Sequence, residues 1–162
     1  MHTKRHAGFT LLELIVTLAV AAIILSFGVP GFMGFVQNSR ATTHTNDLVT
    51  ALNLARSEAT RRGSAVTVCS TTNGASCNGS TDWSTGWVVR DAAGNVLRVW
   101  AERSGGANVV TGGVNSLSFG SRGALTGSAT TFDIKVPDCT GKHARRVSVN
   151  AAGRIAVALL SC

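Results

Sequence analysis

Charged residues and prolines are scarce in this sequence. Only 14% of the 162 residues are Asp, Glu, Lys or Arg, and only two are proline. Hydrophobic residues make up 44%, which excludes an intrinsically disordered chain because there is enough apolar surface to build a core. The 18 glycines indicate many tight turns and argue against a helical bundle.

Patterns that carry catalysis are also missing. The eight acidic residues are scattered without the spacing of a paired-carboxylate site, and no Gly-x-Ser-x-Gly elbow or phosphate-binding loop occurs. His44 and His143 are expected on solvated faces. No Cys-x-x-Cys occurs, and His143 near Cys139 has no second pair to complete a zinc site. We therefore predict a protein that is not an enzyme and uses no metal or cofactor.

One long apolar run stands near the start of the chain. Residues 9–38 contain a single formal charge, on Glu13, and about 20 apolar residues are enough for a helix to span a membrane. Lys4 and Arg5 precede the run, which predicts a cytoplasmic N-terminus. We expect residues 9–38 to cross the inner membrane once, with everything after them outside it.

The segment before this run is typical of a leader that is cut ahead of its apolar region. Ala7 and Gly8 precede the run, whereas an ordinary secretory signal has its small residues after it. The sequence GFTLLE at residues 8–13 resembles the class III leader of type IV pilin-like proteins. The resemblance implies that a prepilin peptidase removes residues 1–8 and methylates the new amino group of Phe9. It also implies assembly into a helical filament whose core is a bundle of such N-terminal helices.

Glu13 is unusual because it lies near one end of the expected span. A carboxylate there costs about a few kcal/mol and calls for a partner. The α-amino group on Phe9 of a neighbouring subunit is a suitable cation, and the resemblance implies the same role, in which Glu13 sets the axial register of each incoming subunit. The alternative is a Glu that reaches the membrane interface in a plain signal anchor.

Helical periodicity continues beyond the apolar run. Gly28, Pro30 and Gly31 should kink or locally melt the helix, or end it before a second one begins. Apolar residues repeat every three to four positions over residues 39–62. Gly63 is the expected C-cap.

After Gly63 the period becomes two, which is typical of strands. We expect strands at residues 65–70, 86–90, 96–101, 108–111, 116–120, 131–136, 145–150 and 154–160. No crossover helix separates them, so an antiparallel sheet is predicted. The fold class is therefore α+β, with a long N-terminal helix packed on a small antiparallel β-sheet domain that spans residues 39–162.

Four cysteines fit an exported domain: Cys69, Cys77, Cys139 and Cys162. An even number in such a domain favours disulfides, and four cysteines allow three connectivities. We favour Cys69–Cys77, which closes a short polar loop, and Cys139–Cys162, which fastens the C-terminal residue. Free buried thiols are the alternative.

Three tryptophans, Trp83, Trp87 and Trp100, are the large anchors of the domain. We interpret them as core or hairpin packing, with a ligand-stacking surface as the alternative. The polar loop at residues 70–84 is expected to be exposed.

Three further segments narrow the resemblance. They resemble segments of the GspH/FimT group of minor pilins and pseudopilins, and they read LARSEATRRG at residues 54–63, AVTVC at 65–69 and GWVVRD at 86–91. The resemblance implies the pilin fold. It implies a minor pilin that helps to initiate or cap a type IV pilus of a Gram-negative bacterium. Such a protein is stored in the inner membrane and joins major and minor pilins at the cell surface. A minor pseudopilin of a type II secretion system is the alternative with the same fold.

A basic cluster near the C-terminus supports another alternative, a DNA-binding pilus component in natural transformation. The cluster consists of Lys142, Arg145, Arg146 and Arg154. A hairpin could bring the arginines together, and clustered basic side chains bind phosphates without reading sequence. Some relatives in the FimT group carry a C-terminal Gly-Arg-x-Arg motif, but residues 153–156 read Gly-Arg-Ile-Ala and lack the second arginine. A solvated basic face, or contact with an acidic neighbouring subunit, is the other interpretation.

Overall fold

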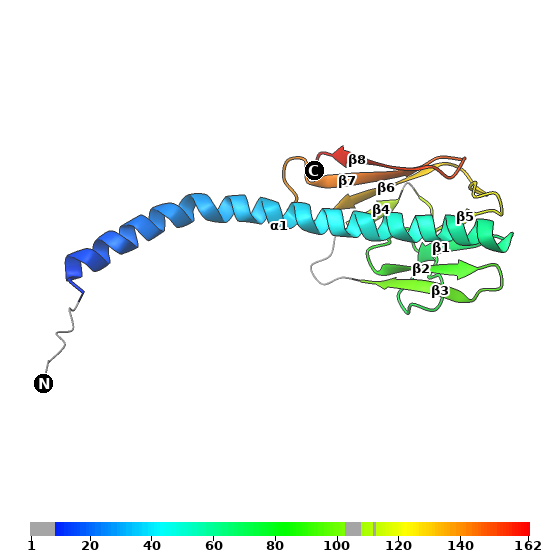
Figure 1. Ribbon diagram of the computed structural model, residues 1–162, viewed down its shortest axis with the longest axis horizontal. Helices are drawn as coiled ribbons and strands as arrows, with labels where there is room; N and C mark the ends of the chain where they lie inside the picture. Colours follow the sequence, from blue (N-terminus) through cyan, green and yellow to red (C-terminus); the bar gives the residue numbers. More distant parts are fainter. Residues whose placement is uncertain (1–8, 103–107, 112) are drawn as a thin grey trace, which may run out of the picture. The chain divides into compact units, whose positions relative to one another are not determined.

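The computed structural model describes residues 9–102, 108–111 and 113–162 (Figure 1). By their internal contacts the residues fall into two compact units, Met1–Val36 and Gln37–Cys162. The boundary predicted from the sequence, between residues 38 and 39, stays a prediction.

Helix α1 (Leu11–Arg62) begins in the first unit. Its backbone is helical without a break through Gly28, Pro30 and Gly31, so the predictions of local melting and of a helix end there are wrong. Proline removes one backbone hydrogen bond, and the turns on either side keep theirs. A bend at Pro30 stays a prediction. Within the described residues, no helix combines the length and the hydropathy that crossing a membrane requires.

In the second unit α1 buries the predicted apolar stripe. Leu48, Leu52, Ala55 and Ala59 are fully buried and share one core cluster with both β-sheets. The helix ends at Arg62 and is followed by Gly63, whose φ of 64° is the left-handed conformation that suits glycine as a C-cap.

Two antiparallel sheets complete this unit (Figure 1). The first has the order β3-β2-β1-β5 and consists of β1 (Val66–Ser70), β2 (Gly86–Asp91), β3 (Val96–Ala101) and β5 (Ser116–Phe119). The second has the order β4-β6-β7-β8 and consists of β4 (Asn108–Thr111), β6 (Thr130–Lys135), β7 (Ala144–Val149) and β8 (Ile155–Leu160). Every predicted strand is present with its ends within one residue, which confirms the α+β class.

The tryptophans lie in the core, as predicted. Trp83 is fully buried, and its ring packs nearly perpendicular to that of Phe132, with 4.9 Å between centroids and 73° between the ring planes. Trp87 and Trp100 are also buried. His44 was expected on a solvated face, and that prediction is wrong because His44 is 8% exposed. It lies one helical turn before Leu48, on the same buried stripe.

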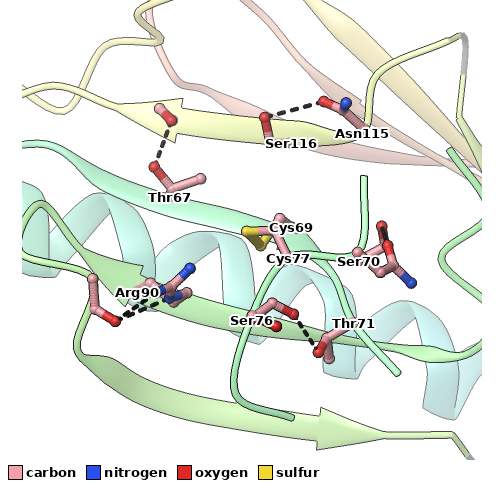
Figure 2. The surroundings of a disulfide bond; sticks show 12 residues. Thr67, Cys69, Ser70, Thr71, Ser76, Cys77, Arg90, Asn115 and Ser116 are labelled. Carbon is pink, nitrogen blue, oxygen red and sulfur yellow. Dashed lines mark hydrogen bonds between the residues drawn. A yellow bond between two sulfur atoms is a disulfide. The ribbon is translucent and has the colours of Figure 1, made fainter. Parts of the chain in front are cut away.

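Both predicted disulfides are present. Cys69–Cys77 joins the end of β1 to the polar loop that follows it (Figure 2), and Cys139–Cys162 joins the segment after β6 to the C-terminal residue. Polar side chains order the loop further, because Ser70 Oγ donates to Asn78 Oδ1 (2.6 Å) and Thr71 Oγ1 donates to the Ser76 carbonyl (2.7 Å). The loop is largely exposed beyond Thr71, in agreement with the prediction.

Gly153 is required by the turn between β7 and β8. Its φ is 75°, and a Cβ there would collide with the carbonyl oxygen of Gly123. We expect Gly153→Ala to lower the free energy of unfolding by ~3 kcal/mol, because backbone strain and overpacking add. Gly63→Ala is the matched control, since Gly63 has a similar φ but nothing within 4 Å of the added atom; strain alone should cost ~1 kcal/mol. Chemical denaturation of both variants in one detergent measures the difference, and equal losses would contradict the clash.

Candidate assembly surfaces

The first unit presents an apolar surface without a cover. Phe9, the large apolar side chains from Leu11 to Leu25, and Phe32, Met33 and Phe35 are each 50–80% exposed. Contiguous exposed apolar surface of this kind marks contact with other proteins or with lipid. The described part of this unit is therefore a candidate assembly surface.

Glu13 lies at the start of this surface, in the first turn of α1. Its backbone N–H donates to Thr10 Oγ1 (3.2 Å), and the Leu14 N–H donates to the Thr10 carbonyl (3.2 Å). Thr10 is thus the N-cap of α1, and Glu three residues later completes the sequence pattern of a capping box. The sequence interpretation missed this local role, although the Thr-x-x-Glu spacing is its signal.

Only part of the predicted leader-cleavage site lies within the described residues. Gly8 lies outside the described residues, whereas Phe9 is described and 80% exposed. The roles of Gly8, Phe9 and Glu13 in cleavage, methylation and assembly stay predictions.

Two of the four residues in the predicted basic cluster, Arg145 and Arg146, use their guanidinium groups in contacts within the domain. Arg146 donates from Nε and Nη2 to the two carboxylate oxygens of Asp133, each over 2.6 Å. This bidentate pair holds the pKa of Asp133 below its usual range. Arg145 donates to the Ala144 carbonyl (3.0 Å) and to Asn38 on α1. Both guanidinium groups are therefore partly engaged within the domain.

The predicted hairpin exists, but it does not gather the cluster. Val149 pairs with Ile155 at the turn, whereas Arg145 pairs with Leu159 near the opposite end of β7 and β8. At about 3.3 Å per residue, the length of these strands separates Arg154 from Lys142 and Arg145. The expectation that the hairpin brings Arg154 next to Arg145 and Arg146 is wrong.

Arg154 instead shares its end of the domain with α1. A Cβ on Gly153 would lie 3.3 Å from Arg56 Nε, so the turn that carries Arg154 lies beside Arg56. The basic residues therefore lie at separate positions along the domain and do not form one cluster.

The last turn of α1 carries a network of ion pairs. Glu58 accepts hydrogen bonds from Arg61 (2.6 Å) and Arg62 (2.7 Å), and these bonds lower the pKa of Glu58 to about 2. Arg62 also reaches Asp91 on β2 (3.3 Å). The network links the end of the helix to the first sheet.

No cluster in the described part of the chain suits a metal ion, since it contains no group of three His, Cys, Asp or Glu side chains placed to bind one. The arrangement consists of an exposed apolar helix, an acidic residue in its first turn and a disulfide-fastened α+β domain. These features are typical of a filament subunit.

Comparison with known proteins identifies this class. The family model described as "Type II transport protein GspH" matches residues 44–153, and the model described as "Prokaryotic N-terminal methylation motif" matches residues 3–29. The chain belongs to the GspH family, which confirms the GspH/FimT resemblance.

Solved structures agree with this assignment. Two crystal structures of the type IV minor pilin FimU from Pseudomonas aeruginosa (strain PAO1) are similar to this chain. One shares 25% identity at a TM-score of 0.62, over 76% of this chain and 92% of that chain. The other shares 24% identity at a TM-score of 0.59, over 72% and 91%. No curated protein matches the sequence.

The family consists of structural components of pili and pseudopili and is not an enzyme family. Its N-terminal motif implies processing by a prepilin peptidase and assembly with other pilins. It also implies a membrane-anchored protein with a periplasmic domain. The chain is thus a minor pilin or pseudopilin with the pilin fold.

Proposed function

We propose that this chain is a minor pilin that helps to initiate or cap a type IV pilus of a Gram-negative bacterium. The observation that carries the proposal is the similarity to the type IV minor pilin FimU over 76% of this chain and 92% of that chain, at a TM-score of 0.62. In this proposal the protein is stored in the inner membrane with residues 39–162 in the periplasm. It then enters the filament and reaches the cell surface.

The N-terminal residues supply the mechanism of entry. Cleavage after Gly8 frees the amino group of Phe9, and the Glu13 carboxylate of one subunit pairs with that cation on a neighbour. The exposed apolar side chains from Phe9 to Leu25, together with Phe32, Met33 and Phe35, exchange lipid for the helices of other pilins. Burial of this surface stabilises the filament, while the ion pair fixes the axial register.

A minor pseudopilin of a type II secretion system is the second candidate. It is favoured by the description of the family as a type II transport protein. DNA binding has no comparable support, because the hairpin separates Arg154 from Lys142 and Arg145, and Arg146 is paired with Asp133.

Deletion of the gene in its host distinguishes the two candidates. We expect sheared surface fractions to lose most of their pili, and expression of the intact chain to restore them, while secretion of exported enzymes continues. Loss of secretion with normal piliation would replace the minor pilin by the pseudopilin. Restoration by the intact chain is the control for effects on neighbouring genes.

A further inference from the structure

A groove of about 890 Å³ lies in the second unit between α1 and β3. Four short polar side chains line it along one face of α1, at helical spacing: Thr50, Asn53, Ser57 and Thr60. Arg56 from α1 and Arg98 from β3 also line it. Short side chains allow another backbone to approach closely, and their hydroxyl and amide groups can hydrogen-bond to it.

Arg56 is held in place without using its hydrogen-bond donors. Added Cβ atoms on Gly123 and Gly153 would each lie 3.3 Å from Arg56 Nε, so the side chain rests against two turns that only glycine leaves open. The residue is partly buried. Among the described residues, no acceptor or carboxylate partners its guanidinium group.

Arg98 is held in a similar way on the other element. Its guanidinium carbon lies 4.8 Å from the centroid of the Trp100 ring, an interaction that restrains the side chain while leaving its N–H groups free. No carboxylate within the described residues pairs with it. Arg61, by contrast, also lines the groove but is tied to Glu58.

These two arginines give the groove its specificity. A guanidinium group offers five donors in a fixed fork that matches a carboxylate, and a group already fixed in position loses less entropy on binding. Among the residues that the structure describes, no Asp or Glu lines the groove. The charge of the groove therefore complements an acidic segment.

We propose that this groove binds an acidic segment of a neighbouring pilin-type subunit, with Arg56 and Arg98 holding its carboxylates. The identity of the partner rests on the proposed function. A peptide suits the site better than DNA, because DNA affinity depends on many phosphate contacts and the groove offers only a few guanidinium groups, of which those of Arg56 and Arg98 have no partner among the described residues. The polar face of α1 supplies partners for peptide N–H and C=O groups.

The test uses the full chain in detergent micelles and a fluorescein-labelled eight-residue peptide of alternating Asp and Ser. Fluorescence anisotropy should show binding that weakens with salt. The Arg56→Gln/Arg98→Gln variant should weaken binding about tenfold or more, because each charge-assisted hydrogen bond makes a large contribution. Arg98→Gln alone should weaken binding to an intermediate extent. Because Arg98 is exposed, this single variant should fold normally and still tests the proposal if the double variant misfolds.

The matched control is Arg40→Gln/Lys142→Gln, which removes the same charge from two exposed residues outside the groove. It should bind within about twofold of the unchanged chain, since exposed distant charges are screened. An Asn/Ser peptide should not bind. Equal losses in both double variants, or absence of binding to the acidic peptide, would overturn the proposal.

Duplex DNA is titrated in parallel. Tighter binding of DNA than of the peptide, lost in the groove variant, would assign the groove to nucleic acid and overturn the peptide proposal. Because these measurements need no filament, failure of the groove proposal is distinguishable from failure of the proposed pilus function, which the deletion experiment tests.

Discussion

Glu13→Ala should prevent incorporation of the chain into filaments while leaving its membrane insertion intact. In the proposed mechanism this carboxylate pairs with the amino group of an adjacent subunit, so the substitution removes that pair. Removal of a charge from an apolar segment also makes insertion easier. Immunoblots of sheared pili and of membranes measure both properties. Normal amounts of Glu13→Ala in the sheared fraction would contradict the proposed role.

The capping contact at the start of α1 requires two further variants. Glu13→Gln keeps a residue that suits this position of a capping box but removes the charge, so it should fail to assemble as Glu13→Ala does. Thr10→Val removes the hydroxyl that accepts the Glu13 N–H and costs about 1 kcal/mol of helix stability, but it keeps the carboxylate and should assemble. Assembly of Glu13→Gln with failure of Thr10→Val would assign the effect to capping.

The sequence alone was sufficient to predict the structure wherever the interacting residues are close to one another along the chain. The burial of Leu48, Leu52, Ala55 and Ala59 follows from a 3.6-residue period, and the alternating burial along β6 follows from a period of two. The Cys69–Cys77 bridge closes a short loop, since the two cysteines are 8 positions apart in the sequence. His44 shows that even local information was incompletely used, since it precedes Leu48 by four residues and shares its face.

The arrangement of the basic residues depends on distant contacts, which local patterns do not specify. The separation of Arg154 from Arg145 follows from the register of β7 and β8. The groove needs Arg56 from the helix, Arg98 from another element and two glycine turns that lie beside Arg56. None of these pairs is close in sequence, so their proximity emerges only from the folded domain.

Replacement of Gly8 by Trp should block removal of the leader, because the resemblance to prepilin leaders implies a cleavage site that accepts only a small residue before Phe9. The uncut chain has no free amino group at Phe9, so it should remain in the membrane and be absent from sheared filaments even though Glu13 is intact. Mass spectrometry of the purified protein should show residues 1–8 still attached. The unchanged chain should begin at a methylated Phe9.

Gly8→Ala is the matched control, since Ala is nearly as small and should still be cut. In the proposed mechanism, Gly8→Trp removes the cation that this chain offers to one neighbouring subunit, and Glu13→Ala removes the carboxylate that it offers to another. Either change alone should therefore keep the chain out of the filament. A mature N-terminus beyond Phe32 in the unchanged chain would show that an ordinary signal peptidase removes the apolar segment, and neither Phe9 nor Glu13 could then contribute to a filament.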